Sequence, residues 1–164
     1  MGVGLTYRTT SPVSAAVAEA VRGDVPGVNR GARWIYCEPV GVRHDEADGY
    51  LTGFSKLNLQ PGPDEYAAAK AEPADRDDFL ALLDALAGWS ARYDLTWELA
   101  VEGQPLGRVA GGAYEPGLRD ALESFAAVAD ELVRYDPFTG ELYDEAGRED
   151  EGPSRPRLYR PDGE

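Results

Sequence analysis

Histidine and cysteine are almost absent from this chain, because His44 and Cys37 are the only residues of their kinds. A Ser-His-acid or Cys-His catalytic centre would have to use that single imidazole, and a structural zinc site needs four ligands, usually Cys or His. One cysteine also excludes an internal disulfide, so nothing points to an oxidising compartment. These absences exclude most familiar catalytic and metal centres.

Long hydrophobic runs are missing as well. No segment approaches the roughly 18 consecutive apolar residues of a transmembrane helix, and the N-terminal residues lack the basic-then-apolar pattern of a secretory signal. Lysine is scarce too, since the basic residues are 14 Arg and only 2 Lys, Lys56 and Lys70. The sequence predicts a cytoplasmic protein that does not bind a membrane.

The sequence also has few motifs that could bind a metal or a cofactor, and its glycines form neither a dinucleotide fingerprint nor a P-loop. His44 and the acids after it, Asp45, Glu46 and Asp48, come nearest to a metal site. Adjacent side chains on an open turn rarely converge on one ion without distant ligands, and Asp is common in turns for backbone reasons. We interpret this segment as a hairpin turn and expect no metal and no cofactor.

Two further candidates for catalysis are a thiol and a pair of carboxylates. Cys37 would need a base to act as a nucleophile, and the simpler interpretation is a small hydrophobic residue buried in a strand. Glu98 and Glu102 would share one strand face with Cα atoms about 13 Å apart, too far for one substrate bond. The residues therefore favour a protein that is not an enzyme.

Acidic residues dominate the composition, with 30 Asp and Glu against 16 Lys and Arg and a net charge of −14. Residues 1–43 hold five basic and three acidic groups, whereas residues 44–164 hold 11 basic and 27 acidic groups. A surface of this sign repels phosphate backbones and attracts basic proteins. We therefore predict no nucleic-acid binding and a protein partner, with a basic partner favoured.

Hydrophobic periodicity predicts an α+β domain. Strands are expected at residues 3–8, 33–38 with 40–44 as a continuation, 50–59, 96–102 and 106–109. Helices are expected from Ser11-Pro12 to Gly23 and at residues 64–71, 75–93 and 116–134, with a loop at residues 23–31.

The order of these elements predicts a ferredoxin-like βαββαβ core, an antiparallel sheet with helices on one face, plus a short fifth strand and a C-terminal helix. Residues 1–134 would form this single α+β domain. Residues 135–164 would form a turn or hairpin followed by a charged, Pro-rich, disordered tail, because they lack the apolar groups that offset chain entropy.

In such a fold the sheet face opposite the helices can be open. The second strand would present either Trp34 and Tyr36 or Ile35 and Cys37 on that face, depending on register. As a candidate binding face we take the exposed aromatic and charged positions Arg8, Trp34, Tyr36, Phe54, Lys56 and Glu98. The alternative is that the last helix folds back and covers the face with its apolar stripe, Leu118, Leu122 and Phe125.

These patterns favour a non-enzymatic acidic interaction domain that binds a protein partner, of an immunity or inhibitor type that neutralises a basic toxin or nuclease. The alternative is a small-ligand-binding protein or an enzyme that uses a pocket on the sheet face. A third interpretation is a homodimer formed sheet to sheet.

Overall fold

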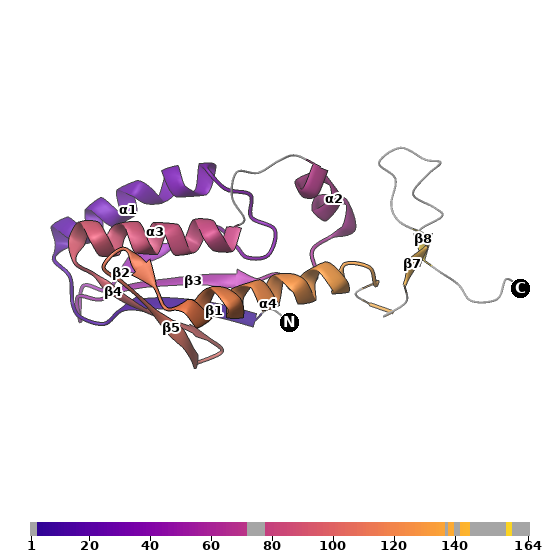
Figure 1. Ribbon diagram of the computed structural model, residues 1–164. Coiled ribbons are helices and arrows are strands. Elements are labelled where there is room, and N and C mark those ends of the chain that lie inside the picture. The colour runs from indigo at the N-terminus through magenta and orange to yellow at the C-terminus, as the bar shows by residue number, and fades with distance from the viewer. Residues whose placement is uncertain (1–2, 72–77, 137, 140–141, 145–156, 159–164) are drawn as a thin grey trace, which may run out of the picture.

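The computed structural model describes residues 3–71, 78–136, 138–139, 142–144 and 157–158. Within these residues the chain forms an open six-stranded antiparallel sheet, a separate two-stranded sheet and four α-helices (Figure 1). The predicted α+β class is confirmed. None of the helices described is both long and apolar enough to cross a bilayer.

The large sheet has the strand order β2-β3-β1-β4-β5-β6, with every neighbouring pair antiparallel. Its strands are β1 (Val3–Thr9), β2 (Val42–His44), β3 (Leu51–Leu57), β4 (Thr96–Val101), β5 (Gln104–Ala110) and β6 (Ala113–Tyr114). The helices are α1 (Ala15–Arg30), α2 (Pro63–Ala71), α3 (Asp78–Tyr93) and α4 (Pro116–Leu132). The small sheet pairs β7 (Tyr143–Asp144) with β8 (Arg157–Leu158).

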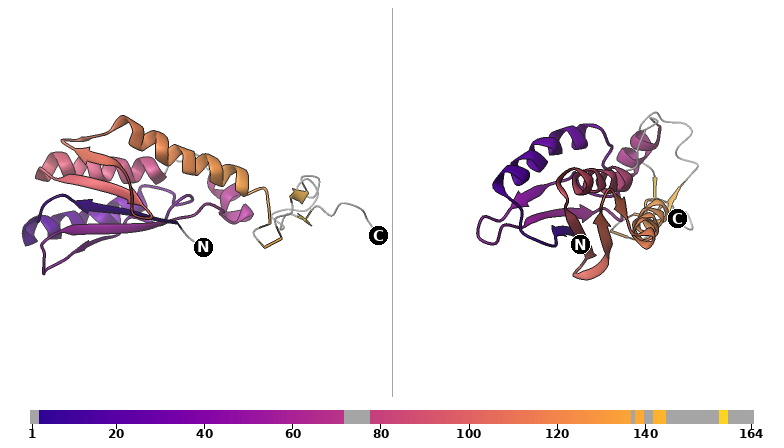
Figure 2. Two further views of the ribbon diagram at one scale, coloured as in Figure 1. Left: turned by 90° about the horizontal axis from the view of Figure 1, so that it is seen from below. Right: turned by 60° about the vertical axis from the view of Figure 1, so that its left-hand side comes forward.

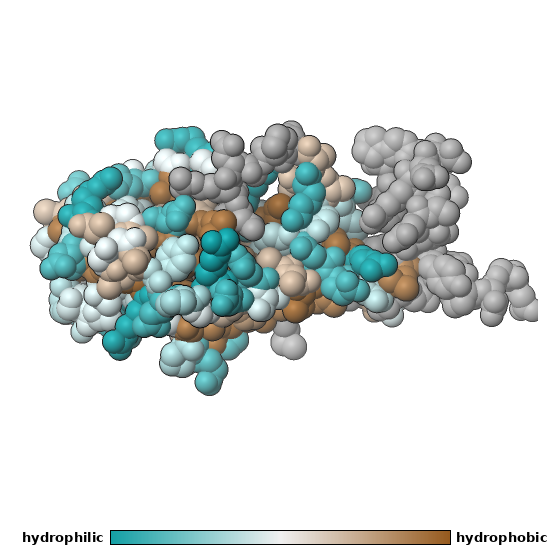
Figure 3. Space-filling view, viewed as in Figure 1, coloured by the Kyte–Doolittle hydropathy of each residue, from teal (hydrophilic) through white to brown (hydrophobic). Residues whose placement is uncertain are grey.

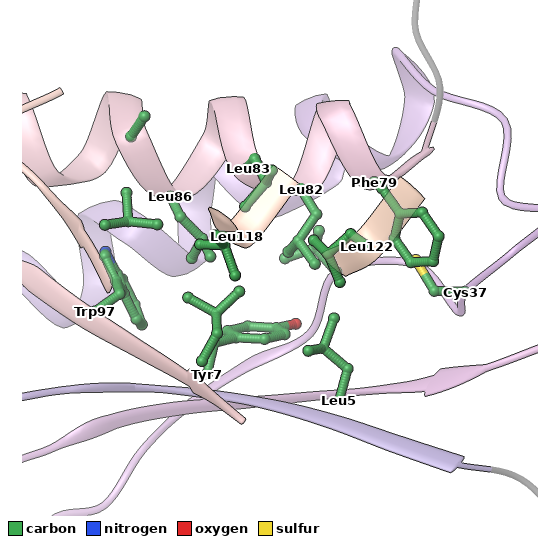
Figure 4. Close-up of a cluster of buried hydrophobic side chains, with 14 of the residues drawn as sticks. Leu5, Tyr7, Cys37, Phe79, Leu82, Leu83, Leu86, Trp97, Leu118 and Leu122 are labelled. Atoms are coloured by element: carbon green, nitrogen blue, oxygen red, sulfur yellow. The ribbon is translucent and has the colours of Figure 1, made fainter. Parts of the chain in front are cut away.

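Helices α1 and α3 lie on one face of the sheet, and the left view of Figure 2 looks at the strands from the other side. Alternation along the strands sends one set of side chains toward the helices. Leu5 and Tyr7 of β1 and Trp97 of β4 are completely buried there, beneath Leu82 and Leu86 of α3 (Figure 4). The core therefore lies between this face of the sheet and the helices.

Helix α4 packs on the same side of the sheet as α1 and α3. Its residues Leu118 and Leu122 are fully buried and belong to the same core cluster as Leu82 and Leu83 of α3 (Figure 4). Because this apolar stripe is used in the core, α4 does not cover the opposite face of the sheet. In the space-filling view, which has the direction of Figure 1, hydrophilic and hydrophobic residues are mixed on the visible face (Figure 3).

Helix α1 is longer than the sequence predicts, because it continues past Gly23 to Arg30 and includes Pro26. Val25 and Val28 of the extra turns pack against the core, and their burial outweighs the helix-breaking tendency of glycine and proline. The helix begins after Ser14, whose hydroxyl accepts a hydrogen bond from the amide of Val17. The loop predicted at residues 23–31 is therefore wrong.

The strand predicted at residues 33–38 is reduced to a single bridge between Cys37 and Leu57. The cause is the buried carboxylate of Asp78, which accepts hydrogen bonds from the amides of Ile35, Tyr36 and Cys37 at 2.8, 2.6 and 3.1 Å. Those amides point to the start of α3, so they are not used in a strand ladder. The strand forms only in the predicted continuation, as the short β2.

The other predicted elements lie close to their expected positions, except that residues 75–77, the predicted start of the helix at 75–93, lie outside the described residues. Strand β6 is an addition that the sequence did not indicate. After α4, Tyr135 forms a bridge with Leu142, and the amides of Phe138 and Thr139 donate to Asp136. The tail predicted to be disordered falls mostly on residues 145–156 and 159–164, which lie outside the described residues.

Candidate binding face of the sheet

A row of charged side chains crosses the sheet face that the helices leave open. The strand register places Thr52 of β3 beside Arg43 of β2 on one side and Arg8 of β1 on the other. Arg8 pairs in turn with Glu98 of β4, and Glu98 with Arg108 of β5. All four charged residues are exposed, so the row presents three guanidinium groups and one carboxylate to solvent.

Two of these arginines have acidic partners. Arg8 Nη2 lies 2.9 Å from Asp48 Oδ2, and its guanidinium carbon lies 3.9 Å from the centre of the Tyr50 ring. Arg108 donates from both Nε (3.0 Å) and Nη2 (2.7 Å) to Glu98 Oε1. Exposed ion pairs of this kind contribute at most about 1 kcal/mol to stability. Their main effect is to fix where the side chains lie.

The aromatic centre of this face is Phe54 of β3, whose side chain is 54% exposed. It pairs with Thr6 of β1, and its ring lies over Gly4, where an added Cβ would come within 2.5 Å of Phe54 Cε2. Glycine at position 4 therefore leaves the space that the ring occupies. Lys56, two residues along β3, is exposed on the same face, and Glu102 accepts a hydrogen bond from the amide of Gly4.

Arg43 and Lys56 differ from Arg8 and Arg108 because neither forms an ion pair with any residue that the structure describes. Both lie close to Phe54 in the register, since Arg43 faces Thr52 and Lys56 follows Phe54 by two positions. The aromatic ring is thus flanked by two cations available to an acidic group of a ligand. Throughout, the open face (Arg8, Arg43, Phe54, Lys56, Glu98 and Arg108) means this set of side chains.

The structure brings four of the six predicted site residues together on the open face, namely Arg8, Phe54, Lys56 and Glu98. Arg43 and Arg108 were not predicted. The sequence feature that could have placed Arg108 on this face is the tight turn after β4, because a hairpin that folds there brings Arg108 opposite Glu98. Arg43 gave no such signal, since its strand has only three residues.

Trp34 and Tyr36 lie elsewhere, on the side of the helices. The side chain of Tyr36 is 3% exposed and stacks on Phe79 of α3, with ring centres 5.9 Å apart. Trp34 donates from Nε1 to the carbonyl oxygen of Asn29 at the end of α1, 3.0 Å away. The physical reason is again Asp78, which holds the backbone of this segment against α3.

A groove of about 450 Å³ lies along β4 and β5 at one end of the open face. The register of the two strands shifts between Leu99 and Ala100, and this irregularity separates the side chains on either side of it. The groove is lined by Glu98, Leu99, Ala100, Pro105, Leu106, Gly107, Arg108 and Glu115. Two carboxylates and a guanidinium therefore line the groove together with apolar side chains such as Leu106.

The segment after His44 is a turn, as its composition predicts. The Asp45 carboxylate accepts from the amide of Ala47, the Asp48 carboxylate accepts from the amide of Tyr50, and Gly49 has a φ of 78°. These carboxylates therefore serve the backbone of the turn. Among the residues that the structure describes, no group of three His, Cys, Asp or Glu is placed to hold a metal ion.

The predicted burial of Cys37 is confirmed, because its side chain is 2% exposed within the core. Glu98 and Glu102 have separate partners, Arg108 and the amide of Gly4, so the two carboxylates do not act on a shared position. Comparison with protein-family models, with curated proteins and with solved structures finds no match to this chain.

Proposed function

We propose that this protein is a non-enzymatic interaction domain that binds a protein partner through the open face of its sheet. The observation that carries the proposal is the exposure of Phe54 beside the row of arginines, two positions along β3 from Thr52. Aromatic residues and arginine are enriched at the energetic centres of protein interfaces. When a partner covers such an exposed aromatic ring, apolar surface is removed from water, and this lowers the free energy of the complex.

The charge of the chain supports a more specific form of this proposal, an immunity or inhibitor type of protein that neutralises a basic toxin or nuclease. The open face itself carries four cations and one carboxylate, whereas the chain as a whole has a net charge of −14. Opposite net charge increases the rate at which two proteins meet, and local contacts then decide which partner stays bound. The acidic body would attract the partner, and the open face would select it.

A photo-crosslinking residue at position 54 tests this proposal. Phe54→benzoylphenylalanine is introduced into the tagged protein, which is irradiated in an extract of the cells that make it. We expect one discrete adduct that still forms at about 0.5 M salt, where purely electrostatic contacts are screened. The matched control is the same residue at Val128, which is 46% exposed on α4, and which we expect to give no adduct.

An adduct that forms at Val128 but not at position 54 would contradict the proposed face. An adduct of twice the mass of the chain, formed by the purified protein alone, would identify the partner as a second copy. Adducts of many masses that disappear at about 0.5 M salt would show charge attraction without specificity, and would contradict an inhibitor or immunity role.

Once the partner is identified, Phe54→Ala measures how much the Phe54 side chain contributes to the binding affinity. We expect the affinity to fall by at least about 30-fold, which corresponds to the roughly 2 kcal/mol lost at an interface hot spot. The free energy of unfolding should change by less than about 1 kcal/mol, because over half of the side chain is already exposed. Calorimetric titration and urea unfolding measure the two quantities, and equal losses in both would refute a binding role.

The second candidate function is the binding of a small ligand in the groove along β4 and β5. The volume of about 450 Å³ suits a small molecule. Glu98, Arg108 and Glu115 would supply the polar contacts, and Leu106 part of the apolar surface. A ligand screen by NMR distinguishes the functions, since groove ligands would shift the amides of β5 and leave those around Phe54 unchanged.

We also propose that the segment from β1 to β4 is a ferredoxin-like unit. In support, its strands lie in the order β2-β3-β1-β4, and α1 and α3 connect strands that are not neighbours. Strands β5 and β6 then extend this sheet at one edge. An experimental structure would test the assignment, and a different strand order would contradict it.

A further inference from the structure

Helix α2 is attached to α4 by a cluster of polar side chains. Tyr66 of α2 and Tyr36 both donate from their hydroxyl groups to Asp130 Oδ1 of α4, each at 2.6 Å. Lys70, one turn further along α2, places its Nζ 3.9 Å from the same oxygen. In Figure 1, α2 lies above the C-terminal part of α4.

The ammonium group of Lys70 also lies over two aromatic rings. Its Nζ is 5.1 Å from the centre of the Tyr36 ring and 5.4 Å from that of Tyr66. Both distances are within the range of about 6 Å in which a cation is attracted by the electrons of a ring face. Two aromatic rings and a carboxylate around one ammonium group are the arrangement that recognises alkylammonium ligands.

The walls of this cage are held in place without Lys70. The Tyr36 ring stacks on Phe79 with an angle of 14° between the planes, and its amide donates to the buried carboxylate of Asp78. Burial, followed by the Asp130 carboxylate, raises the pKa of Tyr66 to about 12, so its hydroxyl stays protonated and continues to donate. A preformed site loses little conformational entropy when it binds a ligand.

Lys70, whose ammonium group lies in the cage, can move out of it without any change in the fold. The side chain of Lys70 is 48% exposed and that of Asp130 is 43% exposed, so the cage is open to solvent on one side. A lysine side chain on a helix surface changes rotamer freely, and moving Lys70 away requires no movement of the backbone. An external cation can therefore reach the same carboxylate and the same ring faces.

We propose that Tyr36, Tyr66 and Asp130 form a binding site for an alkylammonium group, which Lys70 occupies in the free protein and an external ligand can take over. The ligand class is a quaternary or primary alkylammonium, either a small ion or the head group of a lysine side chain. The site lies apart from the open face, so the inference does not depend on the proposed function.

Titration of Lys70→Ala with tetramethylammonium chloride at constant ionic strength tests the site, with amide shifts in NMR as the signal. We expect saturable shifts around residues 36, 66 and 130, and binding to the native protein at least about 10-fold weaker. The native lysine competes because it is tethered at an effective concentration in the millimolar range. No saturable shift in Lys70→Ala would overturn the proposal.

Two controls separate cage binding from a general effect of the cation. tert-Butanol has nearly the same size and no charge, so we expect no saturable binding; equal binding would overturn the proposal. Lys70→Ala combined with Asp130→Asn keeps the shape of the cage and removes its negative charge, and we expect at least about a 10-fold loss of affinity. A double variant that binds as tightly as Lys70→Ala would also overturn it.

The two sources of the ligand are compared in separate titrations of Lys70→Ala. Tighter binding of tetramethylammonium indicates a small quaternary ion, and tighter binding of Nα-acetyl-lysine amide indicates a lysine side chain. The absence of binding to both overturns the site.

Reductive methylation tests the cage in the native chain, where no variant has to fold. The sequence has only two lysines, so carbon-13 formaldehyde labels Lys56, Lys70 and the N-terminal amine. We expect the methyl signal of Lys70 to be shifted upfield by the two ring faces, relative to its position in the urea-unfolded chain. Lys56→Arg assigns the signals, and a Lys70 signal that does not move on unfolding would overturn the proposal.

Discussion

Asp78→Ala is expected to lower the free energy of unfolding by about 3 to 5 kcal/mol, which is a large share of the 5 to 15 kcal/mol of a typical domain. The Asp78 side chain is 1% exposed, and its Oδ2 accepts hydrogen bonds from three consecutive amides, those of residues 35–37. Its Oδ1 accepts from the amide of Phe79 at the start of α3. Alanine would leave these buried donors without their carboxylate partner.

The reason for the large effect is that buried donors without partners cost more than an ordinary hydrogen bond is worth. The carboxylate is also favourably placed at the N-terminus of α3, where the helix dipole stabilises negative charge. Its removal should release residues 35–37 and with them the bridge between Cys37 and Leu57. Tyr36 would lose its fixed position against Phe79, so the cage should weaken as well.

Urea unfolding followed by tryptophan fluorescence measures this loss, and Asp120→Ala is the matched control. Asp120 carries the same side chain on α4 but is exposed, so its removal should change stability by less than about 0.5 kcal/mol. Asp78→Asn should fall between the two, because its amide oxygen can still accept from the loop. A loss below about 1 kcal/mol for Asp78→Ala would show that water replaces the carboxylate.

Gly53→Ala is expected to destabilise the protein by about 3 kcal/mol, at the upper end of the usual cost of overpacking. Gly53 lies opposite Tyr7 in the pairing of β1 with β3, and the Tyr7 ring covers it. A Cβ at this position would overlap the ring and come within 2.5 Å of the backbone oxygen of Gly41. Because the second neighbour is backbone, a side-chain rotation alone cannot relieve the overlap.

Tyr7 cannot move away cheaply, since its hydroxyl is tied to the loop before β2. The hydroxyl donates to the Gly41 carbonyl oxygen at 2.9 Å, accepts from the Gly41 amide at 3.1 Å and lies 3.3 Å from Ser55 Oγ. Burial raises the pKa of Tyr7, so the hydroxyl remains a donor. Displacing the ring would break these bonds inside the core.

Thermal and urea unfolding check the prediction with Gly88→Ala as the control. Gly88 lies on α3 with no atom within 4 Å of an added Cβ, so alanine there should stabilise the protein by about 0.5 to 1 kcal/mol. In a Tyr7→Leu background Gly53→Ala should cost at least about 1 kcal/mol less than in the native chain. Equal costs in the two backgrounds would show that the ring is not the obstacle.

Much of the open face could be predicted from the sequence because strand alternation is a local property. Alternation placed Arg8, Phe54, Lys56 and Glu98 on one side of the sheet, and the structure has them exposed there. Trp34 and Tyr36 were misplaced because the same aromatic pattern suits a strand or a buried loop. A carboxylate more than forty positions away decided between the two.

The position of α4 likewise depended partly on a local sequence pattern and partly on tertiary packing. Its apolar stripe was evident from helical spacing, but Leu118 and Leu122 could have covered either face of the sheet. Packing against Leu82 and Leu83 of α3 put them in the existing core, and the opposite face stayed open. Helix α1 continues through Gly23 and Pro26 for a similar reason, because its apolar side chains pack against core residues that are distant in the sequence.

By itself, the sequence determined the α+β class, the strand faces, the net charge of −14 and the scarcity of histidine and cysteine. These follow from composition and from periodicities of two and 3.6 residues, which act between near neighbours. Only the tertiary structure decided the path of residues 33–38, the groove at β5 and the Tyr36, Tyr66 and Asp130 cage. Each depends on contacts between segments far apart in the chain, which no local pattern encodes.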